Sequence, residues 1–178
     1  MVDASVVIFD YDRKNFIKDI IKSIAANIGD KNIEILVIKS YTDPEIEDFL
    51  KNNNIRFFTL LDHKSQSDYI KCAVKESLGE ILMFHDDDDQ FVDEKISYVY
   101  NLFCDHEDLG YYHNNFNTVD QKGNIVHNRN YKTPEFAPVY IKNSSGSNDY
   151  FIKIAKCPCP CNYIFFAILI LNFIEVDS

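Results

Sequence analysis

The sequence has no tryptophan, and only 5 of its 178 residues are glycine and 5 are proline. This scarcity excludes collagen-like repeats and low-complexity chains, which are rich in one or both residues. Because 46% of the residues are hydrophobic, intrinsic disorder is excluded as well. A chain of this length can bury roughly 70% of the surface that its unfolded form exposes. We therefore expect one globular domain, residues 1–178, that folds without metals or disulfides.

Basic side chains are also scarce, with 18 lysines and arginines against 28 aspartates and glutamates and a net charge of -10. This balance argues against nucleic acid or an anionic membrane as a partner bound by charge. The 5 cysteines are odd in number and fit a reducing cytoplasm. The most apolar run, residues 164–174, is about half as long as a membrane-spanning helix. We expect no transmembrane span, no cleaved secretion signal and a cytoplasmic location, either free or at the inner face of a membrane.

Apolar runs alternate with segments of helical periodicity over roughly the first hundred residues. Short, continuous apolar runs are typical of parallel strands that are buried on both faces, and the periodic segments between them predict covering helices. After Leu109 the pattern becomes irregular and favours antiparallel pairing. We therefore predict an α/β fold with a mostly parallel sheet flanked by helices. The predicted strands are 5–9, 33–38, 55–60 and 80–85, and the predicted helices are 16–28, 44–50, 67–77 and 91–103.

Four consecutive aspartates, residues 86–89, directly follow the predicted strand 80–85. The carboxyl ends of the strands are where open α/β sheets bind ligands. Capping of the next helix accounts for one aspartate, but not for four. Like charges a few ångströms apart repel by about 1 to 4 kcal/mol per pair, so the cluster favours a bound cation. Two carboxylates with substrate phosphates form the oxygen shell that Mg2+ or Mn2+ prefers.

Three segments of the sequence carry motifs: residues 5–13 read SVVIFDYDR, residues 31–38 read KNIEILVI, and residues 79–89 read GEILMFHDDDD. Together they resemble the glycosyltransferases of family 2, whose opening strand and turn, SVVIPTYNR, are similar to residues 5–13. Residues 31–38 are similar to its second strand, and residues 79–89, GEILMFHDDDD, match its Gly-Glu-Tyr-Ile-x-Phe-Leu-Asp-x-Asp-Asp signature. Each motif alone is weak, but their order and spacing make the set specific. The resemblance covers about residues 3–104.

The resemblance implies a GT-A type fold and a nucleotide-diphosphate sugar as donor. The family's Asp-x-Asp motif falls on Asp86 and Asp88, which are therefore expected to bind Mn2+ or Mg2+, with Asp89 as a third candidate ligand. Asp86 and Asp87 are candidate contacts to the donor. Residues 1–109 would form the nucleotide-sugar-binding half, and residues 110–178 an abbreviated acceptor half.

In the family, the turn after the first strand contacts the nucleoside, and the matching positions here are Asp10, Tyr11 and Asp12. Members commonly end the second strand with an acidic pair that reads the base. In this chain residues 39–41, Lys-Ser-Tyr, stand in that place. Uracil recognition by that carboxylate is therefore not expected, which leaves open a different base or a different contact to the same base. Lys39 is a candidate contact to the donor.

The remaining candidates are a diphosphate partner and a catalytic base. Lys64 and Lys71 are the candidate diphosphate partners. The family's base is an acidic residue near the acceptor site, for which Asp149 is our candidate and Glu175 and Asp177 are alternatives. The expected reaction is an inverting, metal-dependent transfer of a sugar to a hydroxyl of a carbohydrate or lipid-linked acceptor.

The chain stops earlier than is usual for the family. Either its acceptor half is abbreviated or the sequence is a piece of a longer protein. The apolar segment 163–174 could then pack against a missing part or form a homodimer.

Two other functions remain open at this stage. Residues 7–12 also resemble the first motif of haloacid dehalogenase-type phosphatases, in which Asp10 would be the nucleophile and Asp12 the acid/base. Against this, Lys14 stands where that family has a threonine. The third possibility is a non-catalytic module that binds a nucleotide sugar and has lost its acceptor side.

Overall fold

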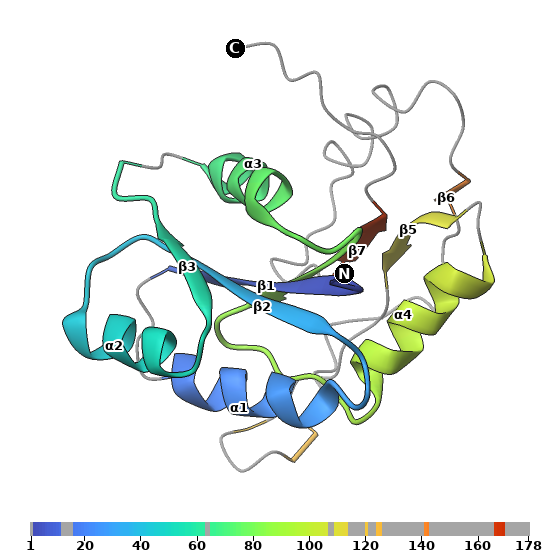
Figure 1. Cartoon of the computed structure of the whole chain (residues 1–178), viewed down its shortest axis with the longest axis horizontal. Coiled ribbons are helices and arrows are strands. Elements are labelled where there is room, and N and C mark those ends of the chain that lie inside the picture. Colours follow the sequence, from blue (N-terminus) through green and yellow to red (C-terminus); the bar gives the residue numbers. More distant parts are fainter. Residues whose placement is uncertain are drawn as a thin grey trace.

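The structure, a computed structural model, describes residues 2–11, 16–62, 65–106, 109–113, 120, 124–125, 141–142 and 166–169. Helices and strands alternate along the first part of the chain, and three further strands follow (Figure 1). The helices are α1 (Ile17–Asn27), α2 (Pro44–Asn52), α3 (Gln66–Glu76) and α4 (Lys95–Asp105). The strands are β1 (Ala4–Asp10), β2 (Ile33–Lys39), β3 (Arg56–Thr59), β4 (Ile81–Asp86), β5 (Leu109–His113), β6 (Ile141–Lys142) and β7 (Phe166–Leu169).

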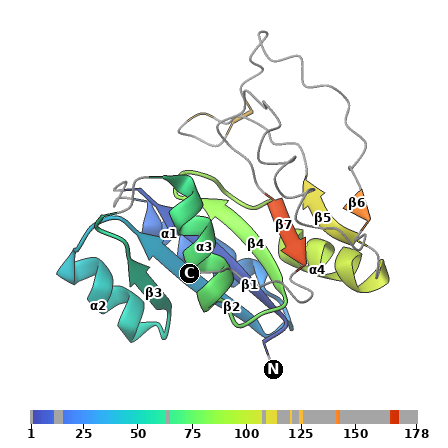
Figure 2. The ribbon, with the colours of Figure 1, turned by 90° about the horizontal axis from the view of Figure 1, so that it is seen from above.

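All of these strands belong to one seven-stranded sheet with the order β3-β2-β1-β4-β7-β5-β6. The pairs β1–β2, β1–β4 and β2–β3 are parallel, whereas β4–β7, β5–β7 and β5–β6 are antiparallel. Figure 2 shows β7 between β4 and β5, so a late segment of the chain completes the early sheet. The predicted α/β class, with parallel strands first and antiparallel strands after Leu109, is confirmed. The boundary between two halves at residue 109 stays a prediction.

The two faces of the sheet carry separate hydrophobic cores. Helices α1, α2 and α4 pack on one face against Val6, Ile8 and their neighbours, and α3 packs on the other face against Val7 and Phe9 (Figure 1). Every residue of β1 is buried, as expected for a central strand that is covered on both sides. The continuous apolar runs that predicted the strands are therefore explained by a helix layer on each face.

The predicted fourth helix begins later than the periodicity indicated. The pattern placed its start at Phe91, but α4 begins at Lys95 because Glu94 adopts a left-handed conformation with φ 62°. The preceding loop is held instead by Asn27 of α1, whose side-chain amide donates to the carbonyl oxygen of Val92 at 3.0 Å. The segment between the aspartates and α4 is thus a loop anchored on α1.

A buried polar network closes the opposite, amino end of the sheet. The Glu34 carboxylate accepts hydrogen bonds from Ser5 Oγ at 2.6 Å and from the Leu78 amide at 2.9 Å. It also pairs with Arg56 at 2.5 Å, and its side chain is 7% exposed. One carboxylate therefore joins β1, β2, β3 and the connection that leads into β4.

We expect Glu34→Gln to lower the free energy of unfolding by about 2 kcal/mol. The substitution removes the negative charge and replaces one of the two accepting oxygens by an amide group that donates. A loss of this size lowers the melting temperature of a domain of this length by roughly 4–8 °C, which calorimetry would detect. The matched control is Glu80→Gln, since Glu80 is exposed near the same end of the sheet. Equal melting temperatures for the two variants would contradict the role assigned to Glu34.

Candidate functional site

The polar segments singled out in the sequence meet at the carboxyl edge of the parallel strands. In the register of the sheet Asp10 lies opposite Lys39, and Phe9 lies opposite Asp86. β1, β2 and β4 are neighbours that run in the same direction and end together (Figure 2). Side chains that are more than seventy residues apart in the sequence are thereby brought to one edge.

The four aspartates at this edge occupy different environments. Asp87 is fully buried, Asp86 and Asp89 are half-buried, and Asp88 is exposed. The Asp87 carboxylate accepts a hydrogen bond from the backbone amide of Tyr11 at 3.0 Å. The Asp89 amide donates to the carbonyl oxygen of Asp86 at 3.3 Å, which closes the turn. Asp87 therefore fastens the acidic turn to the end of β1, while Asp86, Asp88 and Asp89 remain at the surface.

The carboxylates of Asp86, Asp88 and Asp89 are candidate ligands for a metal ion. Within the described ranges, no three histidine, cysteine, aspartate or glutamate side chains are grouped so that they could hold a metal ion by themselves. Mg2+ and Mn2+ do not need such a cage, because they are commonly held by one or two carboxylates and complete their shell with water and phosphate oxygens. The half-buried Asp86 and the exposed Asp88 fit this kind of shared site.

His85 lies directly beneath the acidic turn and carries no charge at neutral pH. Its Nδ1 donates to the carbonyl oxygen of Asp86 at 2.7 Å, and its ring packs edge-on against Phe91 with centroids 4.5 Å apart. Burial lowers the pKa of this imidazole to about 4. His85 therefore supports the turn without adding a positive charge beside the aspartates.

Tyr11, the first residue after β1, is held beside the aspartates. Its ring lies 4.6 Å from that of the fully buried Tyr69, which in turn packs edge-on against Phe9 at 5.6 Å. Burial and the nearby Asp86 raise the pKa of the Tyr11 hydroxyl, so the phenol stays protonated. A half-buried aromatic ring is thus fixed at the edge where the predicted ligand would lie.

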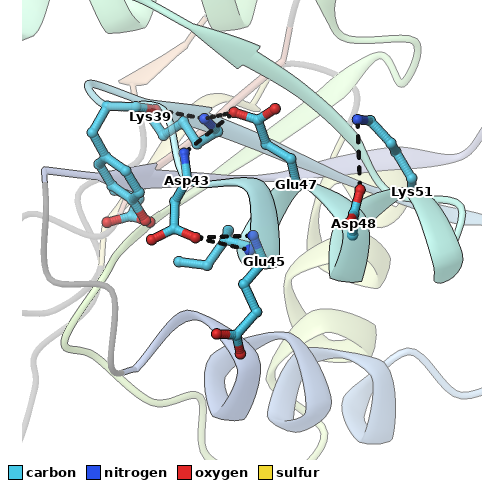
Figure 3. A network of polar contacts seen from close by, with 9 residues as sticks. Lys39, Asp43, Glu45, Glu47, Asp48 and Lys51 are labelled. Atoms are coloured by element: carbon cyan, nitrogen blue, oxygen red, sulfur yellow. Dashed lines mark hydrogen bonds and ion pairs between the residues drawn. The ribbon is translucent and has the colours of Figure 1, made fainter.

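At the ends of β1 and β2, a second polar network turns inward. Lys39 is fully buried, and its ammonium pairs with Glu47 of α2 at 2.8 Å and donates to the carbonyl oxygen of Tyr41 (Figure 3). Asp10 is also fully buried, and its carboxylate accepts a hydrogen bond from the Tyr41 hydroxyl. Both polar side chains are therefore engaged with protein groups.

The sequence matches a known family over most of its length. The sequence profile described as "Glycosyl transferase family 2" matches residues 5–170. The chain belongs to glycosyl transferase family 2. The family assignment agrees with the resemblance drawn from the three motifs and extends it beyond residue 104 into the second half.

Relatives of this family 2 domain include two longer proteins, each described as an uncharacterized glycosyltransferase. The protein from Rickettsia conorii is 26% identical over 129 residues, which is 68% of this chain and 20% of that protein. The one from Rickettsia felis is 26% identical over 130 residues, or 69% of this chain and 21% of that protein. The matched region therefore spans about a fifth of the length of these relatives.

Solved structures share the fold of this family 2 domain. S. aureus TarS 1-349 has a TM-score of 0.51 at 23% identity, covering 60% of this chain and 33% of that chain. The mannosyltransferase PcManGT from Pyrobaculum calidifontis, solved with GDP-Man and Mn2+, has a TM-score of 0.50 at 13% identity and covers 61% of this chain and 34% of that chain. Glucosyl-3-phosphoglycerate synthase from Mycobacterium tuberculosis, solved with Mn2+, UDP and phosphoglyceric acid, has a TM-score of 0.51 at 16% identity. The match covers 62% of this chain and 42% of that chain. The predicted GT-A type fold is thereby confirmed.

The phosphatase alternative loses its support. It required Asp10 as a nucleophile, but in the structure this carboxylate is fully buried and bonded to the Tyr41 hydroxyl. A nucleophile has to reach the phosphorus atom of a substrate, and a buried carboxylate does not. Together with the family match, this geometry favours sugar transfer.

Several sequence candidates lie outside the described residues: Asp12, Lys64, Asp149, Glu175 and Asp177. Lys71 is exposed on α3. The contacts of Lys39 were not anticipated, because its partner Glu47 lies in the following helix. The signal available in the sequence was the Lys-Ser-Tyr run at residues 39–41, which departs from the family pattern.

Part of the apolar segment 163–174 is described as β7, which pairs with β4 on one edge and with β5 on the other. Its backbone is therefore used within this chain and does not offer an edge to a second copy. Dimerisation through the segment stays a prediction. None of the helices in the described part of the chain is long and apolar enough to cross a membrane.

The Lys39–Glu47 pair gives a prediction for acid stability. The hydrogen bond that the Glu47 carboxylate accepts from Lys39 lowers the pKa of Glu47 below its ordinary value near 4.5. A carboxylate whose pKa is lower in the folded state stabilises the fold above its unfolded pKa, and this contribution is lost as the pH falls through the folded value. The melting temperature of Glu47→Gln should therefore lie below that of the parent at pH 7 and approach it as the pH falls through the lowered pKa of Glu47. The control Asp48→Asn, whose exposed ion pair with Lys51 is 4.0 Å long, should show no such convergence.

Proposed function

We propose that this family 2 domain binds a nucleoside-diphosphate sugar at the carboxyl edge of β1, β2 and β4 and transfers the sugar to a hydroxyl of a carbohydrate or lipid-linked acceptor. The observation that carries the proposal is the acidic turn at the end of β4, fastened to the end of β1 by the Asp87–Tyr11 hydrogen bond. Support also comes from proteins of the same fold: a TarS structure contains UDP-GlcNAc, and the PcManGT structure contains GDP-Man and Mn2+.

The roles proposed at this edge follow from exposure and charge. Asp86 and Asp88, with Asp89 beside them, are the residues that would hold Mn2+ or Mg2+. When bound, the cation supplies positive charge next to the diphosphate leaving group. Asp87 serves a different purpose, because its buried carboxylate holds the backbone of Tyr11 in place. Tyr11 is then positioned as a contact to the nucleoside of the donor.

The proposed transfer is a single displacement with inversion. The acceptor oxygen forms a bond to the anomeric carbon while the bond from that carbon to the diphosphate oxygen breaks, and a general base takes the proton of the acceptor hydroxyl. The base proposed from the sequence is Asp149. Transfer of the hydroxyl proton to a base next to the acceptor makes the acceptor oxygen a stronger nucleophile as it attacks the anomeric carbon.

Isothermal titration calorimetry of UDP and GDP, with Mn2+ and with EDTA, tests donor binding. We expect micromolar binding of at least one of them with Mn2+ and an affinity at least about tenfold lower with EDTA, since the cation links two sets of negative charges. Failure of both nucleotides to bind would contradict the proposal. Binding together with absence of transfer, measured with UDP- and GDP-sugars and a panel of glycan and lipid-linked acceptors, would favour the non-catalytic alternative.

A further inference from the structure

Tyr41 occupies a particular position at the carboxyl edge, directly beyond the ends of two strands. The amide of Ser40 donates to the carbonyl oxygen of Asp10 at 3.2 Å, which continues the β1–β2 pairing past the last residue of β2. Tyr41 is the next residue, and its side chain is half-buried. Its hydroxyl reaches back to the carboxylate of Asp10, so the ring lies across the end of β1.

Buried groups hold this ring in place. The Tyr41 hydroxyl donates to Asp10, and the Lys39 ammonium lies 5.2 Å from the centre of the ring. The same ammonium donates to the carbonyl oxygen of Tyr41, so both the side chain and the backbone of this residue are fixed. Lys39 itself pairs with Glu47 at 2.8 Å (Figure 3). Its ammonium also lies 5.4 Å from the centre of the Phe57 ring.

These contacts determine which chemistry the β1–β2 end of the edge presents to a ligand. Asp10 and Lys39 are both fully buried, so neither charge lies at the surface to read the hydrogen-bonding edge of a base. The half-buried rings of Tyr11 and Tyr41 follow the ends of the same two strands. An aromatic ring stacks on any base because every base has a π-face. A ring that is already fixed also loses little conformational freedom when a ligand binds.

We propose that Tyr41 forms an aromatic wall of the nucleobase subsite, that Asp10 and Lys39 are positioning residues for its ring, and that the site binds pyrimidine and purine nucleoside diphosphates with similar affinity. This inference rests on the proposed function and refines it, because it assigns the base contact to stacking. The cation and the diphosphate are bound at the end of β4, so the base contributes affinity but little selectivity.

Calorimetry of the 178-residue chain with Mn2+ and four probes, UDP, GDP, ADP and inorganic pyrophosphate, tests the inference. The dissociation constants of the three nucleotides for the parent should agree within about fivefold. Tyr41→Leu should weaken all three by about tenfold and leave pyrophosphate binding unchanged, because pyrophosphate has no base to stack. The matched control Tyr98→Leu, at an exposed tyrosine of α4, should change none of the four.

Two further variants keep the test informative if Tyr41→Leu does not fold. Tyr41→Phe keeps the ring and loses the bond to Asp10, and Lys39→Met keeps the length of the side chain and loses the charge. Each should weaken nucleotide binding by about threefold through a less ordered ring, with pyrophosphate binding unchanged. An equal loss for nucleotides and pyrophosphate would mean that these residues act only on the stability of the edge, which would overturn the inference.

A preference of the parent for one base above about thirtyfold would also overturn the inference, because it would show that the base is read by hydrogen bonds. That result would leave the proposed function standing. If no nucleotide binds while Mn2+ and pyrophosphate do, the proposed donor binding is contradicted and the inference fails with it. If none of the four probes binds, the proposed function fails and the inference fails with it.

Discussion

Replacing Gly79 by alanine is expected to destabilise the domain by about 3 kcal/mol or more, since a methyl group would be forced into main chain that is itself buried. A Cβ atom at this position would lie 2.4 Å from the carbonyl carbon of Ala4 and 2.6 Å from the amide nitrogen of Ser5. The neighbouring atoms are backbone of β1, which is paired on both sides and cannot move away. The Gly79 amide also donates to Ser5 Oγ at 2.9 Å, which holds the two segments together.

The measurement is the free energy of unfolding from urea titrations of the parent and of two glycine variants. Gly29→Ala is the matched control, because a Cβ there would meet Ser97 Oγ only at 3.6 Å, although φ is +65°. An alanine held at a positive φ costs about 1 kcal/mol, so the free energies of unfolding of the two variants should differ by about 2 kcal/mol. If both variants lose the same free energy of unfolding, the close contact between Gly79 and the backbone of β1 does not explain why glycine is needed there.

Asp88→Asn is expected to lower the Mn2+-dependent affinity for UDP or GDP by at least about thirtyfold, which corresponds to about 2 kcal/mol at tenfold per 1.4 kcal/mol. Asp88 is the exposed member of the acidic turn, so a cation can approach it from solvent, and the substitution leaves the core untouched. The melting temperature without metal should be unchanged or slightly higher, because one of several repelling charges is lost.

Two controls separate cation binding from general effects of charge. Asp93→Asn removes an exposed charge from the same loop and should leave the affinity within about twofold of the parent value. Titration with EDTA should give the same weak binding for the parent and for Asp88→Asn. Unchanged affinity of Asp88→Asn with Mn2+ would remove Asp88 from the proposed cation site, and a loss shared with Asp93→Asn would point to a nonspecific effect of charge.

The strands of the parallel sheet could be predicted closely. The predicted strand 80–85 is observed as β4, Ile81–Asp86, and the predicted strand 33–38 is observed as β2, Ile33–Lys39. These strands are largely buried, so their sequences are apolar apart from Glu34 and His85, and each strand ends at a charged residue, Lys39 or Asp86. The position of the aspartates at a strand end followed from the same pattern, because polarity returns where the sheet stops.

The different roles of the four aspartates could not be predicted in this way. Four identical side chains give no periodicity, and the burial of Asp87 depends on the Tyr11 amide, which belongs to a different strand. The start of α4 was missed for a related reason: the apolar Phe91 fits the helical pattern but packs on His85 from the preceding loop. In both cases the deciding partner is distant in the sequence or outside the helix.

The amino-acid order alone determined the α/β layering, the parallel strands and the place of the acidic turn, because hydrophobic periodicity reports burial residue by residue. The tertiary structure decided where the charges point. Lys39 looked like a residue that could meet a donor, yet Glu47 and Tyr41 draw its ammonium into the protein. A buried charge is stable only beside a partner, and that partner is supplied by packing between elements rather than by the local sequence.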